Sequence, residues 1–381
     1  MRFSIQIPGP TGGNSIELDA GASLIFVGAN GGGKTRLAVL LEKLHEPASH
    51  RISAHRALSL NPNVSKISEA DARRGLLKGG TTAGYQRTAH RWGAKEAVAL
   101  LNDFDFLIQA LFAEQTNTTY RNHSSARAGQ TQIFLPTKLE MLVEIWDRLL
   151  PHRKIVLSGD DIQVSIAGSA EAYSASEMSD GERSVFYMVG QVLIAPPDSL
   201  LIFDEPELHV HRSITGKLWD ELEAARPDCA FVLITHDLEF AASRVAAKYV
   251  IRDYSPAIGW TVDPVPGDTG FSEDTATLIL GSRRPVLFSE GTGTSLDRAI
   301  YRACYPEWTV VARGGCEAVI HSVVTMRTNQ AFTRVSCSGL VDADDYDNAD
   351  VTKLGSLGVG VLPVSEIENL VVLPSVSRAI A

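Results

Sequence analysis

The 381-residue sequence has no long uninterrupted hydrophobic run and only four cysteines. No run approaches the roughly 18 apolar residues of a membrane span, so no membrane contact is expected. Cys229, Cys304, Cys316 and Cys337 form neither a C-x-x-C pair nor a zinc-binding spacing, which predicts reduced thiols in a cytoplasmic protein. Met1–Pro8 alternates apolar and polar residues, which indicates a strand opening a hairpin and not a signal peptide.

Basic residues are fewer than acidic ones, which gives a formal net charge of −10. This charge excludes a protein that coats nucleic acid by bulk attraction, so any such contact needs a local basic surface. The 44% hydrophobic and 21% charged residues are typical of a globular protein, and the length favours two domains. We expect these at residues 1–284 and 285–381.

A glycine-rich stretch carries the first chemical signal. The apolar run Leu24–Val27 predicts a buried strand, GANGGGKT at 28–35 fits the pattern G-x-x-x-x-G-K-[ST], and Arg36–Leu44 predicts an amphipathic helix. Such a loop turns its N–H groups toward a phosphate at the positive end of the helix. The alternative is a chance match in a Gly-rich turn. The candidate nucleotide-binding residues are Gly28, Asn30, Gly31, Gly33, Lys34 and Thr35, with Lys34 on the β/γ-phosphates and Thr35 on Mg²⁺.

Two later strands end in candidate catalytic residues. LLIF at 200–203 precedes Asp204, which is predicted to hold Mg²⁺ through water, and Glu205, which is predicted to polarise the attacking water. The alternative is a charged turn after a core strand. The apolar run 231–235 precedes His236, and a lone histidine there is more often structural. Its distance behind Asp204 nevertheless keeps His236 as a candidate site residue.

The segment MSDGER at 178–183 opens a helix predicted at Ser184–Leu193. A Ser and a Gly at a helix N-terminus favour anion binding. The glycine-rich loop already has its own glycines, so Ser179 and Gly181 have no evident use within the same subunit.

These four motifs, GANGGGKT, MSDGER, LLIFDEPELHVH and LITHD, resemble in their order the ABC-type ATPases of the SMC-like and OLD-like branch. The resemblance covers about residues 1–280. It implies ATP and Mg²⁺ as cofactors, Glu205 as catalytic base and His236 as the switch. It also implies a homo-oligomer through the ATPase heads, in which Ser179 and Gly181 contact the partner's ATP.

The sequence departs from that family at two places. Its signature is nearer SGGQ, whereas here Asp180 and Glu182 add negative charge, and His55 or Arg56 stands near the place of the lid-sensing glutamine. The nearby pair His209 and His211 suggests a metal site, but we favour a segment that lies along the dimer interface.

An insert at about 72–150 is predicted to form a compact helical lid. Helices are predicted at Glu96–Glu114 and Lys138–Leu149, with a polar loop at Thr116–Gln132 between them. Residues 72–95 contain basic but no acidic side chains, and are interpreted either as a solvated mobile loop or as a contact to the backbone of nucleic acid. The basic residues are Arg73, Arg74, Lys78, Arg87, Arg91 and Lys95.

A new pattern of alternating strands and helices begins at residue 285, which predicts a small parallel sheet. Glu290, Asp342 and Asp344 each follow a predicted strand, so they should meet at one edge and form an oxygen-only pocket for Mg²⁺ or Mn²⁺. Such a pocket supports two-metal phosphodiester chemistry. The further carboxylates Asp345, Asp347 and Asp350 are interpreted as a solvated acidic loop.

The order E-G, G-G, D-x-D resembles a Toprim domain, and SEGTGTSLDRAIY and LPVSEIENL resemble the Toprim-like effector paired or fused with an ABC-type ATPase in PARIS phage-defence systems. This resemblance covers about residues 285–374, and we expect the domain to be incomplete after Leu370. It implies an α/β protein in which a P-loop ABC-type head controls a nuclease, with Glu290 as metal ligand and candidate base.

The expected function is therefore ATP hydrolysis that controls a metal-dependent Toprim-like nuclease, in anti-phage defence. The expected partners are DNA or RNA, and a phage-encoded trigger or a separate effector protein. The alternative is a sensor or scaffold ATPase whose Toprim-like tail only docks partners. A transporter ATPase is disfavoured, because that class lacks the three carboxylates of the tail.

Overall fold

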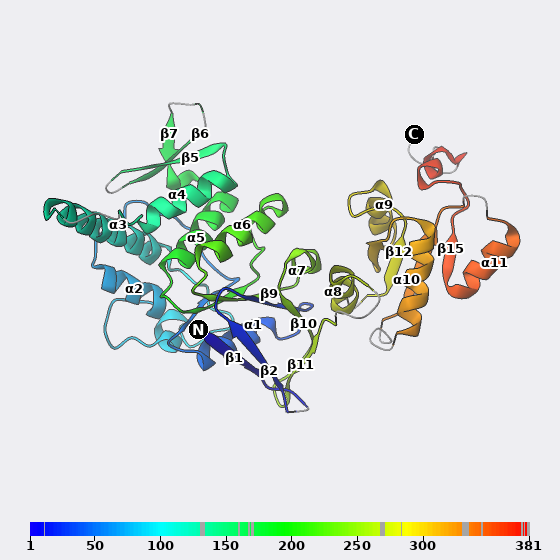
Figure 1. The fold of residues 1–381 in the computed structure, drawn as a ribbon, viewed down its shortest axis with the longest axis horizontal. Coiled ribbons are helices and arrows are strands. Elements are labelled where there is room, and N and C mark those ends of the chain that lie inside the picture. The colour runs from blue at the N-terminus through cyan, green and yellow to red at the C-terminus, as the bar shows by residue number, and fades with distance from the viewer. Residues whose placement is uncertain are drawn as a thin grey trace.

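The computed structural model describes residues 1–10, 12–129, 134–158, 161–166, 168, 171–266, 271–282, 284–329, 335–343, 346–374, 376 and 378. These residues form two parts, a head and a C-terminal domain, which lie side by side in Figure 1. None of the described helices combines the length and apolar character that crossing a lipid bilayer requires.

A six-stranded sheet organises the head, in the order β11-β10-β3-β9-β8-β4. Every neighbouring pair is parallel except β10 and β11. The strands are β3 (Ser23–Val27), β4 (Ser49–Ile52), β8 (Leu200–Asp204), β9 (Ala230–Thr235), β10 (Ala247–Ser255) and β11 (Gly259–Pro264). Since parallel strands end at one edge, the residues that follow β3, β8 and β9 lie close together.

Both faces of this sheet are covered, which explains its almost wholly apolar strands. Leu24 and Phe26 pack on one face with α1 (Lys34–Leu44) and with the hairpin of β1 (Arg2–Ile7) and β2 (Asn14–Asp19). Ile25 and Val27 pack on the opposite face, in the core that also contains the helices of residues 180–243. Those helices are α5 (Asp180–Ile194), α6 (Arg212–Ala225) and α7 (Leu238–Ser243). The predicted opening hairpin is confirmed.

The insert between β4 and α5 is helical, with a small antiparallel sheet at its end. Its elements are α2 (Glu69–Lys78), η1 (Arg87–Arg91), α3 (Phe104–Arg127), α4 (Lys138–Leu149), β5 (Arg153–Leu157), β6 (Ile162–Ile166), β7 (Ala172–Ser174) and η2 (Ala175–Glu177). The helix predicted at Lys138–Leu149 is confirmed. Thr137 and Glu140 form a capping box that fixes its first turn.

Two predictions in this insert are wrong. Residues 96–103 are not helical, and Thr116–Arg127 continues α3 instead of forming a polar loop. The second half of α3 projects past the rest of the insert, as Figure 1 shows, so most of its side chains meet water. A helix with little to bury carries no apolar period, which is why its sequence resembled a loop.

Both interpretations of the basic segment 72–95 are wrong for its central arginines, which are internal. Arg87 and Arg91 are each only 6% exposed, so neither is solvated or able to reach nucleic acid. Their guanidinium groups lie 3.5 and 3.8 Å from the carboxylate of Glu42, and Arg91 also lies 3.3 Å from Asp103. The missing acidic partners are therefore supplied by other parts of the chain.

The two remaining arginines of this segment belong to α2. Arg73 and Arg74 pair with Glu69 and Asp71 of the same helix, and both are partly exposed. They belong to an ordered helix and not to a mobile loop.

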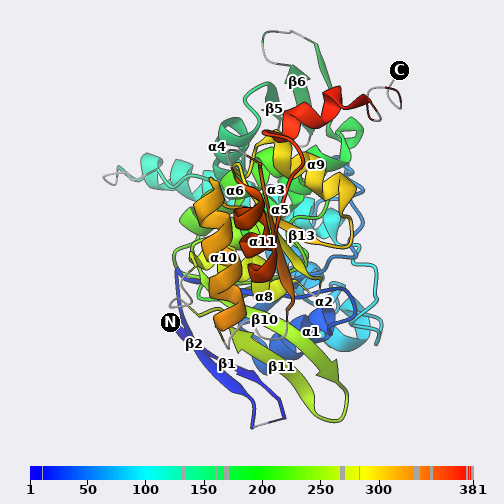
Figure 2. The same ribbon diagram turned by 90° about the vertical axis from the view of Figure 1, so that its right-hand side faces the viewer.

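The C-terminal domain has a four-stranded parallel sheet in the order β13-β12-β14-β15, as its strand–helix alternation predicts. The strands are β12 (Val286–Ser289), β13 (Thr309–Ala312), β14 (Cys337–Val341) and β15 (Val359–Val361). One face packs on α9 (Leu296–Cys304) and η4 (Ile367–Val372), and the other on α10 (Cys316–Thr328) and α11 (Asn348–Leu357). Figure 2 shows α10 and α11 together in front of the head.

The helix α8 (Glu273–Gly281) joins the two parts. It packs against α7 and β10 of the head and against β13 of the C-terminal domain. Phe271 stacks on Phe288 of β12, so the apolar core continues from one part into the other. The position of the domain boundary at residue 284 stays a prediction.

Candidate nucleotide site

The glycine-rich loop connects β3 to α1 and needs its glycines for backbone conformation. Gly31 and Gly33 have φ angles of +82° and +79°, a region that side chains other than glycine rarely adopt. A Cβ on Gly33 would lie 2.6 Å from Cγ of Tyr254. The indole Nε1 of Trp260 also donates a hydrogen bond to the Gly33 carbonyl, at 3.1 Å. The hairpin of β10 and β11 therefore supports this loop from behind.

Lys34 begins α1 and is only 6% exposed. Its Nζ donates to the Ala29 carbonyl at 3.4 Å and to Oδ1 of Asn30 at 3.2 Å, so the ammonium group folds back over the loop. It also lies 4.0 Å from Oε1 of Glu205. A cation held over a ring of backbone N–H groups is suited to bind a phosphate chain.

Asp204 ends β8 and faces the Thr35 side chain. Burial raises the pKa of Asp204, and the Thr35 hydroxyl opposes this shift. Asp204 is 1% exposed, and within the described part of the chain neither carboxylate oxygen has a hydrogen-bond partner of good geometry. A buried carboxylate without donors beside a threonine hydroxyl fits a divalent cation, because Mg²⁺ takes oxygen ligands. These two side chains would hold it.

Three side chains converge beyond the ends of β8 and β9. His236 Nδ1 lies 3.2 Å from Oε1 of Glu205 and 3.3 Å from Oε1 of Glu207. Thr235 donates to Glu207 at 2.6 Å, while burial raises the pKa of Glu207. Glu205 has a φ of +51°, which is unusual for a residue with a side chain. Its N–H donates to the Ile234 carbonyl at 2.8 Å, which helps hold that conformation.

The structure thus brings together Lys34, Glu205 and His236, which follow β3, β8 and β9 in the chain. Their catalytic roles stay predictions. Sequence reasoning missed Glu207, which contacts His236 as closely as Glu205 does. The second acidic residue in the run DEPE could have pointed to it.

Ser179 and Gly181 lie at the start of α5. The glycine-rich loop belongs to a different part of the chain, between β3 and α1. Ser179 is the N-cap, and its hydroxyl donates to Oε2 of Glu182 at 2.8 Å within a capping box. Arg153 pairs with the same carboxylate at 2.9 Å. Glu182 therefore caps the helix end at which an anion would bind.

The two pairs left open by the sequence have structural contacts. Arg56 is buried and donates to the carbonyls of Ser53 and Leu208, so it links the end of β4 to the segment after β8. His211 caps α6 through Ser213, and His209 is exposed with a φ of +64°. Within the described ranges, no group of three His, Cys, Asp or Glu side chains is arranged to hold a metal ion.

Two of the residues predicted to bind metal in the C-terminal domain lie close together at the edge of the second sheet. Oε1 of Glu290 accepts a hydrogen bond from the Asp342 N–H at 2.9 Å. Burial and the negative charges of Asp342 and Asp297 raise the pKa of Tyr301, which indicates that Asp297 lies nearby. Asp297 was missed in the sequence. Asp344, the third predicted ligand, lies outside the described residues, as does Asp345.

One carboxylate of the predicted acidic loop has a structural role. Asp347 caps α11, accepting from the N–H groups of Ala349 and Asp350. Asp347 and Asp350 are both exposed, as predicted, but they belong to the start of a helix and not to a loop.

Residues 100–242 match the family described as "AAA domain, putative AbiEii toxin, Type IV TA system". The match contains Asp204, Glu205 and His236, whereas the glycine-rich loop precedes it.

Among solved structures, an ATP-binding cassette of an ABC transporter in its ADP conformation is similar at 13% identity and a TM-score of 0.33, over 66% of this chain and 86% of that one. The Smc head bound to the C-terminal winged-helix domain of ScpA is similar at 13% identity and a TM-score of 0.36, over 71% and 99%. A putative ABC transporter ATP-binding protein from Pyrococcus furiosus gives 11% identity and a TM-score of 0.29, over 62% and 92%.

At such scores the structural likeness supports no conclusion about function. The conclusion rests on the family match and on the geometry of the site. The match places residues 100–242 in a P-loop ATPase context. The loop, the carboxylate pair and the histidine meet at the edge of one parallel sheet. Together they support a P-loop ATPase in the first part of the chain.

Proposed function

We propose that the head hydrolyses Mg-ATP and thereby controls a metal-dependent, Toprim-like nuclease in the C-terminal domain, in anti-phage defence. The observation that carries the ATPase part is the convergence of Lys34, Glu205 and His236 around one point. The oxygen Oε1 of Glu205 lies 4.0 Å from Lys34 Nζ and 3.2 Å from His236 Nδ1.

Each residue of the head has a role that follows from its position. The loop N–H groups and Lys34 bind the phosphates, and Glu205 accepts a proton from the attacking water. His236 holds the Glu205 carboxylate in place and lies where it could contact the γ-phosphate. Asp204 and Thr35 would hold a magnesium ion, which would neutralise negative charge on the phosphates.

The nuclease part is supported by Glu290 and Asp342, whose contact joins the ends of β12 and β14. Carboxylates at the carboxyl edge of a parallel sheet are suited to hold Mg²⁺ or Mn²⁺. DNA or RNA would be the substrate. The second candidate is a sensor or scaffold whose tail only docks a partner. It is favoured by the contacts that join the tail to the rest of the chain, namely α8 on β13 and the ion pairs of Glu239 with Arg298 and Arg302.

The test compares wild type, Lys34→Ala and Glu290→Ala for ATP hydrolysis, for Mn²⁺-dependent cleavage of DNA and RNA, and for phage protection in cells. Lys34→Ala should abolish ATP hydrolysis, since it removes the cation that binds the phosphates. Glu290→Ala should abolish cleavage and protection but leave hydrolysis by the head unchanged, because its site belongs to another sheet.

Hydrolysis by Lys34→Ala near the wild-type rate would refute the role of the glycine-rich loop. Cleavage and protection by Glu290→Ala at wild-type levels would replace the nuclease with the scaffold. A phage-encoded trigger, a separate effector and a cytoplasmic location stay predictions.

A further inference from the structure

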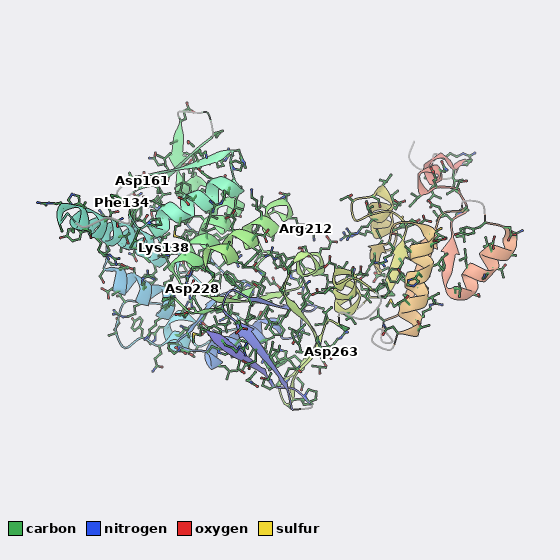
Figure 3. The ribbon with its side chains drawn as sticks, in the orientation of Figure 1. Phe134, Lys138, Asp161, Arg212, Asp228 and Asp263 are labelled. Atoms are coloured by element: carbon green, nitrogen blue, oxygen red, sulfur yellow. The ribbon has the colours of Figure 1, made fainter. Side chains whose placement is uncertain are left out.

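A cavity of about 480 Å³ lies between the head and the C-terminal domain, and four arginines line it. Arg212 begins α6 of the head, and Figure 3 shows it on the side of the head nearest to the C-terminal domain. Arg284 precedes β12, while Arg298 and Arg302 lie one turn apart on α9. Both parts of the molecule therefore contribute cationic groups to one wall.

These arginines outnumber the carboxylates that face them. Glu239 of α7 lies 3.0 Å from Arg212, 2.5 Å from Arg298 and 3.0 Å from Arg302. Asp237 also lines the cavity and lies 3.3 Å from Arg212. The four arginines and two carboxylates of the lining give two net positive charges, with His236 left out of the count.

The side chains are suited to a particular class of ligand. Guanidinium groups bind phosphate oxygens in pairs, which makes arginine the preferred residue for phosphate recognition. Trp308 also lines the cavity and offers an aromatic ring on which a base could stack. The volume is within the range of about 300–1,000 Å³ that is usual for small-molecule sites. We propose that this cavity binds a nucleoside phosphate, either a free nucleotide or the 5′-phosphate end of a nucleic-acid strand.

This site is separate from both sites described above. Thr309 and Val310 at the start of β13 line it, so it lies at the opposite edge of the C-terminal sheet from Glu290. On the head side it shares only His236 with the cluster around Glu205. A bound phosphate would compete with Glu239 for its arginines, and would thereby change the ionic contact that joins α7 to α9.

The experiment measures binding by isothermal titration calorimetry on the full chain carrying Lys34→Ala, which weakens nucleotide binding at the glycine-rich loop. The probes are thymidine 5′-monophosphate, thymidine, and a 5′-phosphorylated thymidine dinucleotide. The monophosphate should bind and thymidine should not, and the affinity should fall as salt rises. Tighter binding of the dinucleotide, by about tenfold, assigns a strand end, whereas equal or weaker binding assigns a free nucleotide.

Two variants that should change the affinity in opposite directions separate specific binding from damage to the fold. Arg302→Glu should weaken monophosphate binding by about tenfold, and Glu239→Gln should tighten it several-fold by releasing the arginines. The matched control is Arg2→Glu, because Arg2 is exposed, pairs with Asp19 and lies on the hairpin of the head. The proposal is overturned if the monophosphate does not bind, or if Arg302→Glu binds it as well as Arg2→Glu does.

Discussion

The residue with the least favourable surroundings in the head is Asp204. Its carboxylate is buried and lacks good hydrogen-bond donors among the described residues, so ionisation in the folded state is penalised. Burial accordingly raises its pKa. Such a carboxylate destabilises the fold when no cation is bound and can coordinate a cation when one is present. Both properties are expected of a magnesium ligand.

We therefore predict that Asp204→Asn stabilises the protein in the absence of Mg²⁺ while abolishing ATP hydrolysis. The expected rise in Tm is about 2–4 °C, which corresponds to ~1 kcal/mol for a domain of this size. Differential scanning calorimetry with and without Mg-ATP measures it. The control Asp253→Asn changes an exposed carboxylate of β10 and should leave Tm unchanged. Greater stability of wild type without Mg²⁺ would contradict this account.

The pH dependence of stability has a definite sign. Because the folded-state pKa of Asp204 is raised, its contribution to the free energy of unfolding is favourable below the unfolded-state pKa and is lost as pH rises through the folded-state value. The stabilising effect of Asp204→Asn should therefore shrink as pH falls through that window. Urea unfolding at several pH values without Mg²⁺ measures the difference. A difference that grows toward acid pH would show that another group is responsible.

At the scale of elements, local sequence patterns predicted most strands and helices, whereas contacts between residues far apart in the sequence could not be predicted. The strand, loop and helix around Gly28–Thr35 are adjacent in sequence, so their geometry could be read directly. The same holds for the C-terminal sheet, because strands alternate with helices there. By contrast, the partner of Arg87 and Arg91 is Glu42, which stands outside their segment. No local pattern could show that these cations are buried.

The buried arginines form one network with α1, β4, η1 and α3. The Arg51 guanidinium pairs with the carboxylate of Glu42 in α1 at 2.8 Å. Its Cζ also lies 3.8 Å from the centre of the Trp92 ring. Asp103, which contacts Arg91, also accepts a hydrogen bond from Tyr187 of α5 at 2.7 Å. The helix that follows the glycine-rich loop is thus tied to the helix that follows Ser179.

We predict that Glu42→Gln lowers the free energy of unfolding by about 3–5 kcal/mol, because it leaves three buried guanidinium groups facing a neutral amide. The midpoint of urea unfolding measures this loss. The matched control is Glu69→Gln, which removes the partner of Arg73 on the partly exposed surface of α2 and should cost no more than about 1 kcal/mol. Equal effects of the two variants would mean that the network adds no stability.

At the scale of the whole molecule, the family resemblance implies that one chain alone does not form a complete nucleotide site. Ser179 and Gly181 open α5, whereas Lys34, Glu205 and His236 meet at the end of the head sheet. A second copy would bring its own α5 to the bound nucleotide, with the positive end of that helix toward the phosphates. Glu182 already caps this end, so a phosphate must compete with its carboxylate.

This arrangement predicts that Glu205→Gln traps an ATP-bound dimer. An amide cannot accept the proton of the attacking water, so ATP stays bound and continues to join the two heads. Light scattering should show that the mass with ATP is twice that without it, starting from 41.2 kDa per chain. Adding Ser179→Arg should abolish the change by blocking the helix end, whereas Ser356→Arg, on the exposed side of α11, should not. A dimer that persists with Ser179→Arg would exclude α5 from the interface, and a mass that does not respond to ATP would refute the pairing of the heads.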